Sequence, residues 1–285
     1  MEVKINGIPY LADEGEFVLN VARRNHVAIP TLCHHDGLPG QGCCRLCLVE
    51  AVERGRSRVV TACVFPVAEG LEVLTDTDRV AAVRRRNLAL LRLRAPEADR
   101  VKQLCSYYKV AEDGRFEAMD GERCILCGLC VRACASLGTG AISAINRGVT
   151  KKIAPPYEEA PESCIGCGSC AEVCPTKAIQ VEQTRDTRVI WDRAFAMQNC
   201  SACGEPYTTV EAAHHAARAT GQDEAAHHTA RATGQDEAAH HTARATRQDE
   251  AIHHTARATS QHEALLCPAC RAKRVGEVMR SVYGR

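Results

Sequence analysis

The first residues of the chain alternate apolar and polar side chains in the manner of short β-strands. The segment EVKI, the turn dipeptide Asn6-Gly7 and a second short strand at Ile8 to Tyr10 predict a β-hairpin. A helix is expected over Glu16 to Asn25, where apolar residues recur at helical spacing. Further short strands are predicted at residues 47–52, 58–61 and 71–74. A hairpin, a helix and further strands in this order predict a small β-grasp sheet.

Residues 79–118 carry a second apolar pattern, which is helical. Val80, Val83, Leu88 and Leu91 recur at the spacing of one helix face. The run Arg84-Arg85-Arg86 is interpreted as a solvated face of this helix rather than a docking surface. We therefore expect a helical connector between two domains.

The most conspicuous pattern is a repeat. Residues 213–264 are four copies of a 13-residue unit, AHHTARATGQDEA in the second copy, and they hold nine of the twelve histidines. Alanine is almost the only apolar residue, so a helix of these units would bury little, and we expect a solvated helical spacer. Metal binding by the histidines is the alternative. A shift of 13 residues rotates successive His-His pairs by roughly 220° on a straight helix, which disfavours a row of ligands.

Composition excludes several classes of function. A net charge of +1 and a pI near 7.5 provide no basic footprint for nucleic acid or for a membrane surface. No apolar run approaches the length of a membrane span, and the amino terminus begins as a strand rather than as a signal segment. No nucleotide-binding loop or pair of nucleophile and base is present. We expect a cytoplasmic protein that does not insert into a membrane.

Eighteen cysteines in 285 residues indicate disulfides or metals, and their spacing distinguishes the two. Residues 124–134 and 164–174 each follow C-x2-C-x2-C-x3-C, and Pro175 follows the second run. This is the pattern of bacterial ferredoxins, in which the fourth cysteine of each run binds the cluster of the other run. The alternative, a zinc or disulfide scaffold, does not account for two tandem copies. The pattern predicts two [4Fe-4S] clusters, one on Cys124, Cys127, Cys130 and Cys174, the other on Cys164, Cys167, Cys170 and Cys134.

Five further cysteines lie near the amino terminus. They are Cys33, Cys43, Cys44, Cys47 and Cys63, one more than a [2Fe-2S] cluster needs. If Cys44 and Cys47 are the close pair, the spacing from Cys33 to Cys63 is C-x10-C-x2-C-x15-C. If Cys43 replaces Cys44, the close pair becomes C-x3-C. Plant-type ferredoxins use C-x4-C-x2-C, so the wider first gap differs from theirs.

The segment PTLCHHDGLPGQGCCRLCLVE, residues 30–50, resembles a known group of [2Fe-2S] domains. These begin the large iron-sulfur subunit of complex I, the small diaphorase subunit of NAD-reducing hydrogenases and the accessory region of iron-only hydrogenases. The resemblance implies that Cys33, Cys44, Cys47 and Cys63 are the ligands and that Cys43 is spare. His34 and His35 suggest a Rieske-type site, but Rieske histidines come from separate motifs and four suitable cysteines are already present.

The same resemblance implies a function. In those proteins a histidine and three cysteines hold a further cluster where this chain has residues 79–118, which contain Cys105 alone and no histidine. That cluster is predicted to be missing. The chain is expected to be an electron-relay subunit without its own substrate site, in a hetero-oligomer with a flavin- and NADH-binding subunit. The terminal module would act on hydrogen, quinone, formate or a heterodisulfide. A redox-sensing regulator and an iron-sulfur subunit of a non-NAD oxidoreductase are the alternatives.

The carboxy-terminal part carries a last set of cysteines. Cys200, Cys203, Cys267 and Cys270 form two C-x2-C pairs like the knuckles of a zinc ribbon. The 63 residues between the pairs shorten to 24 when three repeat copies are removed, which is close to a usual ribbon loop. Zinc is predicted there, with a further iron-sulfur cluster as the alternative. The fold class is α+β, with expected domains at 1–78 ([2Fe-2S]), 79–118 (connector), 119–185 (two [4Fe-4S]) and 197–285 (zinc-ribbon-like).

Overall fold

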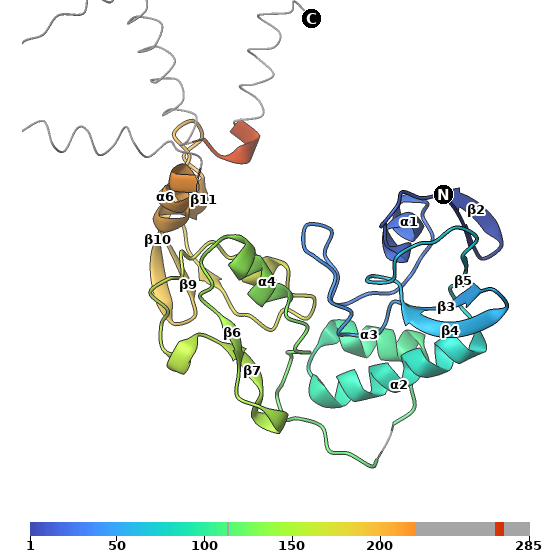
Figure 1. Cartoon of the computed structure of the whole chain (residues 1–285). Helices are drawn as coiled ribbons and strands as arrows, with labels where there is room; N and C mark the ends of the chain where they lie inside the picture. Colours follow the sequence, from blue (N-terminus) through green and yellow to red (C-terminus); the bar gives the residue numbers. More distant parts are fainter. Residues whose placement is uncertain (113, 220–265, 271–285) are drawn as a thin grey trace, which may run out of the picture. The chain divides into compact units, whose positions relative to one another are not determined.

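A computed structural model describes residues 1–112, 114–219 and 266–270 (Figure 1). The chain divides into two compact units, which are described separately. The first comprises Met1–Pro161 and Ser169–Gln180, and the second comprises Glu162–Gly168 and Val181–Arg285.

The amino-terminal part of the first unit is a five-stranded mixed sheet. Its strand order is β2-β1-β5-β3-β4, in which β1 and β5 run parallel and the other neighbours are antiparallel. The hairpin predicted around Asn6-Gly7 is confirmed, since β1 and β2 pair on either side of it. The strands are β1 (Glu2–Ile5), β2 (Ile8–Leu11), β3 (Leu48–Glu53), β4 (Arg56–Thr61) and β5 (Glu72–Leu74).

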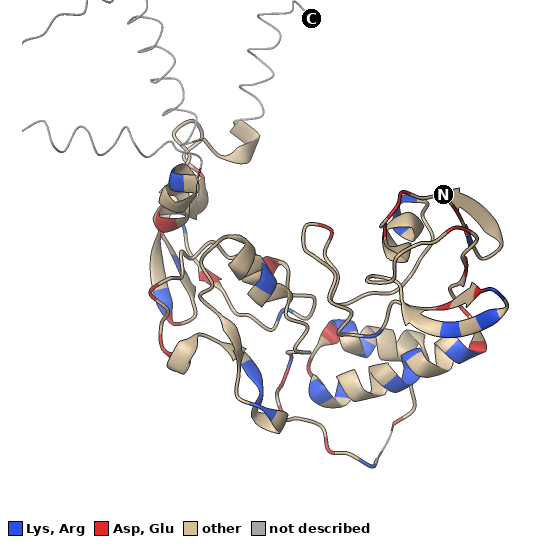
Figure 2. Cartoon of the chain, in the orientation of Figure 1, with Lys and Arg blue, Asp and Glu red and all other residues tan. Residues whose placement is uncertain are grey.

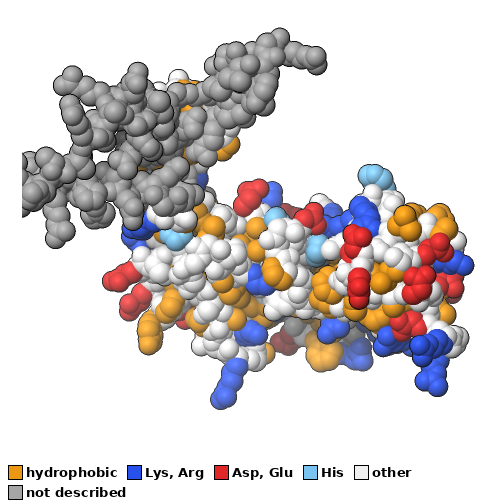
Figure 3. All heavy atoms as spheres, turned by 45° about the horizontal axis from the view of Figure 1, so that its top comes forward, with side chains coloured by type: hydrophobic (Ala, Val, Ile, Leu, Met, Phe, Trp, Pro, Cys, Tyr) orange, Lys and Arg blue, Asp and Glu red, His pale blue; other side chains and the backbone are white. Residues whose placement is uncertain are grey.

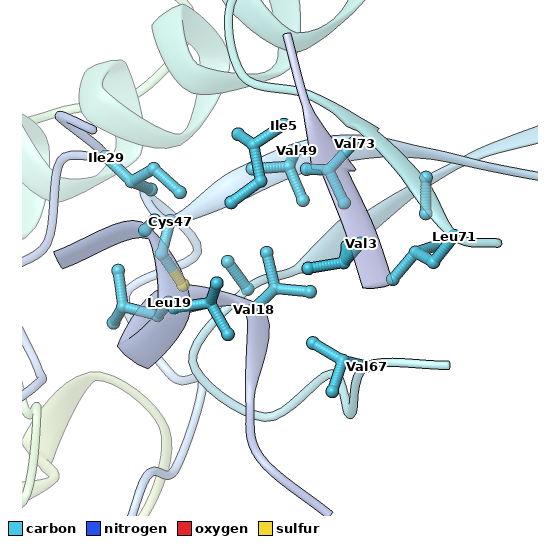
Figure 4. Packing of buried hydrophobic residues seen from close by; sticks show 14 of the residues in the cluster. Val3, Ile5, Val18, Leu19, Ile29, Cys47, Val49, Val67, Leu71 and Val73 are labelled. Carbon is cyan, nitrogen blue, oxygen red and sulfur yellow. The ribbon is translucent and has the colours of Figure 1, made fainter. Parts of the chain in front are cut away.

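Helix α1 (Val18–Arg24) packs on this sheet and confirms the predicted helix, although it is shorter at both ends. Its residues Val18, Leu19, Val21 and Ala22 are fully buried in one apolar cluster with the inward-facing residues of β1, β3 and β5. Figure 4 shows Cys47 in the same cluster, beside Leu19. A predicted cluster ligand is therefore anchored in the apolar core of the domain.

Two helices follow the sheet, α2 (Asp78–Arg94) and α3 (Asp99–Tyr107), which pack against each other (Figure 1). The side chain of Thr77 caps α2 by accepting the Val80 N–H at 3.2 Å. Val80 and Leu88 are fully buried, as the apolar spacing predicted, whereas Val83 and Leu91 are half-buried. The helix predicted for these residues is confirmed, whereas their role as a connector between two domains stays a prediction.

Arg84 corrects the prediction that the three arginines form a solvated face. Its side chain is 3% exposed and donates to three main-chain carbonyls, those of Leu46 at 3.1 Å, Leu48 at 2.6 Å and Thr75 at 2.9 Å. Strand ends leave carbonyls that need donors, and a planar guanidinium with five N–H groups supplies several at once. The other two arginines of the run, Arg85 and Arg86, are exposed. Figure 2 shows the basic residues along α2.

The rest of the first unit carries most of the ferredoxin-type cysteines. Helix α4 (Leu129–Ser136) and the short helix α5 (Ser169–Glu172) pack together. Strands β6 (Ser143–Ile145) and β7 (Lys152–Ala154) form an antiparallel pair, and single 3-10 turns η1 (Gly148–Thr150) and η2 (Pro156–Glu158) flank β7.

The second unit contains an antiparallel sheet in the order β11-β10-β9-β8, which the sequence analysis missed. Phe195 on β10 is 1% exposed and is the largest fully buried side chain among the described residues. Phe195 and Met197, two large apolar residues at a spacing of two in RAFAMQN, could have revealed this strand. The elements are β8 (Glu182–Gln183), β9 (Thr187–Ile190), β10 (Arg193–Asn199), β11 (Pro206–Thr209) and α6 (Val210–Ala219).

Helix α6 includes the start of the first 13-residue repeat. Residues 220–264, which hold the remainder of the repeats, lie outside the described residues, so the predicted helical spacer stays a prediction. None of the helices in the described part of the chain has the length and apolarity that a membrane crossing requires. On the face drawn in Figure 3, acidic and basic side chains are interspersed among apolar ones.

Replacing Arg84 by alanine is predicted to destabilise the first unit by about 3–5 kcal/mol, because three inward-facing carbonyls lose their donor. Denaturant titration of the anaerobically purified chain, followed by circular dichroism, measures the change. Arg85→Ala is the matched control, since an exposed arginine is expected to change stability by at most about 0.5 kcal/mol. Equal midpoints for the two variants would show that Arg84 has no such role.

Candidate iron-sulfur and metal sites

The loop between α1 and β3, together with the turn after β4, gathers the five amino-terminal cysteines. Cys43 is exposed, whereas the other four are buried: Cys33, Cys44, Cys47 and Cys63. The Cys44 N–H donates to the Cys33 sulfur at 3.3 Å. The Cys43 and Cys44 side chains interact with the Cys33 sulfur and lower the pKa of Cys33. Burial thus separates the four predicted ligands from the predicted spare cysteine.

Cys47 and Cys63 form a second close pair in the same site. A hydrogen bond between their side chains lowers the pKa of Cys63 and raises the pKa of Cys47. The charges of Cys33 and Cys44 also act on this pair, so all four sulfurs face one region. Four converging thiols, one of which accepts a main-chain N–H, suit an iron-sulfur cluster, whose sulfurs take hydrogen bonds from the protein.

Helix α4 and the loop before it carry the first ferredoxin-type run. Burial raises the pKa of Cys127 to about 11 and of Cys130 to about 12, and it also raises the pKa of Cys124. The Cys174 side chain contributes to all three shifts, which places the fourth cysteine of the second run beside the first three of the first run. The structure thus brings together the four residues predicted to bind one [4Fe-4S] cluster.

Main-chain N–H groups point at the sulfurs of this set. Leu126 donates to the Cys124 sulfur at 3.4 Å, and Ala178 donates to the Cys174 sulfur at 3.3 Å. Gly128 adopts a φ of +70° at the start of α4, a conformation that glycine takes without strain. Donors aimed at sulfur stabilise thiolate over thiol and thereby offset part of the effect of burial, which suits the predicted metal ligands.

The cysteines predicted for the second [4Fe-4S] cluster fall in both units, so each half is described by itself. In the first unit, the Cys134 sulfur accepts the Ala141 N–H at 3.2 Å and lies 3.1 Å from the Thr139 hydroxyl. Cys170, in α5, is buried.

In the second unit, Cys164 and Cys167 lie in a loop held by two arginines. Arg188 donates to the carbonyls of Gly166 at 2.9 Å and Cys167 at 3.0 Å, and Arg193 donates to the Cys164 carbonyl at 3.0 Å. Gly166 has a φ of +65°, and a Cβ there would lie 2.5 Å from the ring of Phe195. The glycine is therefore required both by conformation and by space.

Cys200, Cys203, Cys267 and Cys270 form a compact group in the second unit. Their sulfurs all lie within 4.8 Å of one another. The Cys267 N–H donates to the Cys200 sulfur at 3.3 Å, and hydrogen bonds from the main chain, that of Cys267 foremost, lower the pKa of Cys200 to about 6. The structure thus brings the two predicted knuckles together across the repeats.

His34 and Cys105 lie near these sites but are not among the predicted ligands. His34 follows Cys33 and has an 8% exposed side chain with its Nε2 3.3 Å from Asp36. Cys105 is buried on α3, donates to the Leu88 carbonyl at 3.6 Å, and has a pKa raised by burial. It packs as a core residue in the apolar cluster that α2 and α3 share.

The amino-terminal cysteine loop touches the first ferredoxin-type loop directly. The Cys43 thiol donates to the Cys127 carbonyl at 3.1 Å, and the charge of Cys33 adds a smaller contribution to the rise that burial causes in the pKa of Cys127. Arg132 on α4 donates to the Cys33 carbonyl at 3.1 Å and also to the Pro39 carbonyl. Sequence reasoning missed Arg84 and Arg132, because one arginine among many carries no spacing signal.

Two family models match the two parts of the chain that carry these cysteines. Residues 1–78 match the 2Fe-2S iron-sulfur cluster binding domain, and residues 118–181 match the 4Fe-4S dicluster domain. Together with the converging thiols, these matches define an iron-sulfur protein with a [2Fe-2S] domain followed by a [4Fe-4S] dicluster domain.

Relatives of the chain are redox proteins. It is 28% identical over 254 residues to the HndD subunit of the NADP-reducing hydrogenase of Solidesulfovibrio fructosivorans, covering 78% of this chain and 42% of the relative. It is 28% identical over 207 residues to the mitochondrial NADH-ubiquinone oxidoreductase 78 kDa subunit of Candida albicans, covering 63% of this chain and 28% of the relative. The alpha subunit of the NADPH-Fe(3+) oxidoreductase of Geobacter sulfurreducens is 30% identical over 184 residues, covering 56% and 21%.

The chain is therefore homologous to iron-sulfur subunits of NADH- and NADPH-linked oxidoreductases, which confirms the predicted resemblance. It spans less than half the length of these relatives. Among solved structures, a chain of an NAD⁺-reducing [NiFe]-hydrogenase in the H2-reduced state is similar at 26% identity. That match has a TM-score of 0.48 and covers 54% of this chain and 74% of the hydrogenase chain.

Replacing single cysteines by serine tests which of them bind the [2Fe-2S] cluster. Cys43→Ser is predicted to retain the [2Fe-2S] absorption and EPR signals, because Cys43 is exposed and lies outside the proposed ligand set. Cys44→Ser, the matched change one residue along, is predicted to abolish or strongly shift these signals. The opposite result would show that Cys43 is the ligand.

Proposed function

We propose that this chain is the electron-relay subunit of a hetero-oligomeric NADH-linked oxidoreductase. A flavin-containing partner subunit would oxidise NADH, and a terminal module would use the electrons. The clusters, when bound, supply reversible one-electron transfer. The chain itself contributes the cysteine sets, the donors around them and the contact between two of the cysteine loops.

The observation that carries the proposal is the contact between the loop of Cys33 and the loop of Cys127. The Cys43 thiol reaches the Cys127 carbonyl, and the charge of Cys33 acts on the Cys127 thiol. Two cofactor sites joined in this way within one compact unit suit passage of electrons between them. A protein that stored or sensed a single cluster would need no such contact.

The proposed [2Fe-2S] ligands are Cys33, Cys44, Cys47 and Cys63. The first [4Fe-4S] set is Cys124, Cys127, Cys130 and Cys174, and the second is Cys134, Cys164, Cys167 and Cys170. This complement corresponds to about ten irons per chain.

We assign the four carboxy-terminal cysteines to one zinc ion rather than to a fourth cluster. A tetrahedral site with zinc–sulfur bonds of about 2.3 Å sets its sulfurs roughly 3.8 Å apart. The described sulfurs lie within 4.8 Å of one another, and those of Cys203 and Cys267 are 3.9 Å apart. A cubane places four irons and four sulfides between its ligands and needs a wider set. The group therefore suits a single ion that closes the two knuckles.

A redox-sensing regulator is the second candidate, and its output domain would have to lie among residues that the structure does not describe. Reduction by NADH separates the two functions. In the native complex, NADH is expected to reduce the clusters of this chain anaerobically, whereas the isolated, fully loaded chain stays oxidised with NADH and is reduced by dithionite. A native complex whose clusters do not respond to NADH would contradict the relay function, and reduction of the isolated chain by NADH would reveal a substrate site within it.

Metal analysis tests the zinc assignment. The intact chain is predicted to hold about one zinc in addition to its iron. Cys267→Ser is expected to lower zinc without changing the iron content, since Cys267 belongs to the compact group alone. Cys105→Ser is the control, because Cys105 lies in the core of the first unit. Iron loss in Cys267→Ser at constant zinc would assign the group to a cluster.

A further inference from the structure

Arg132 is a cation placed between two predicted cluster sites. It lies on α4 between Cys130 and Cys134, two predicted [4Fe-4S] ligands. Its guanidinium donates to the main-chain carbonyl of Cys33, a predicted [2Fe-2S] ligand outside that helix, at 3.1 Å. A second donor of the same group reaches the Pro39 carbonyl. One side chain thus links the backbone of both cysteine loops.

The Arg132 side chain is not fully satisfied by these contacts. Its Nε is buried and has no hydrogen-bond partner among the described residues. Buried donors are nearly always paired, and a guanidinium remains charged at any physiological pH. The sulfurs of a bound cluster are acceptors of the kind that such a donor lacks.

The charge of Arg132 bears on both sites. A cluster held by four thiolates is anionic, and reduction adds one more negative charge to it. A nearby cation in a partly buried setting stabilises the more negative state, because the attraction is less screened than in water. Removing the cation should therefore make reduction harder at each site.

We propose that Arg132 is a positioning residue that ties the Cys33 loop to α4 and raises the reduction potentials of the [2Fe-2S] cluster and of the [4Fe-4S] cluster on Cys124, Cys127, Cys130 and Cys174. This rests on the cluster assignment made for the proposed function. It extends that function by naming the group that adjusts both potentials together. The Cys43–Cys127 hydrogen bond reinforces the same junction without adding a charge.

The test compares anaerobically purified, full-length Arg132→Gln with the wild-type chain in EPR-monitored redox titrations with chemical mediators. Both potentials are expected to shift to more negative values. Arg100→Gln is the matched control, because Arg100 is exposed on α3 and lies outside both cysteine loops. A fully loaded Arg132→Gln chain with both potentials equal to those of the control would overturn the proposal.

Arg132→Lys separates charge from geometry and covers the case in which the glutamine variant loses its clusters. Lysine keeps the charge but lacks the planar fork that spans two carbonyls. We expect potentials near those of the wild type and faster hydrogen exchange of residues 33–44. If neither variant loads iron, Arg132 serves folding and the proposal is wrong. Mediators replace NADH in these titrations, so a failed relay and a failed role for Arg132 give different results.

Discussion

The arrangement of the first unit depends on one apolar cluster into which both cysteine loops are built. Cys33, Cys44 and Leu46 enter it from the amino-terminal loop, and Ile125 and Cys127 enter it from the ferredoxin-type loop. Helices α2 and α3 also contribute, with the fully buried Leu88 and Val101. Loops usually lie on the surface because their backbone polar groups need partners. Burying two of them requires donors inside the protein, and Arg84 provides these on either side of Cys47.

This packing has a consequence for redox chemistry. A close-packed interior holds ligands at defined positions and excludes water, so a cofactor bound there gains or loses an electron with little rearrangement. Helices α2 and α3 lie between the two cysteine motifs in the sequence. In this chain they offer the buried Cys105, which bonds to a carbonyl of α2. Helices α2 and α3 thus contribute rigidity, and the contact between Cys43 and Cys127 brings the two predicted cofactor sites together directly.

Much of this organisation could be predicted from local pattern. The hairpin at Asn6-Gly7 and the buried positions of α2 follow from spacings of two and three to four residues, and the cysteine runs follow from metal chemistry. Arg84 and Arg132 could not be predicted. Leu48 lies 36 residues from Arg84 in the sequence, and Cys33 lies 99 residues from Arg132. Every residue has a main-chain carbonyl, so such an acceptor cannot be recognised from the sequence. The sheet at β8–β11 was missed although β10 has seven residues, because β8 has two, β9 and β11 have four each, and all four lie beside conspicuous cysteine motifs.

The central claim is that the [2Fe-2S] cluster and the cluster on Cys124, Cys127, Cys130 and Cys174 are immediate neighbours. Low-temperature EPR of the fully reduced full-length chain measures this directly through magnetic interaction between the two centres. The account predicts that the [2Fe-2S] signal is broadened and relaxes rapidly in the intact chain. It also predicts that this signal becomes narrow and slowly relaxing in a Cys124→Ser variant that has lost the neighbouring cluster. A [2Fe-2S] signal that is identical in both proteins would contradict the account.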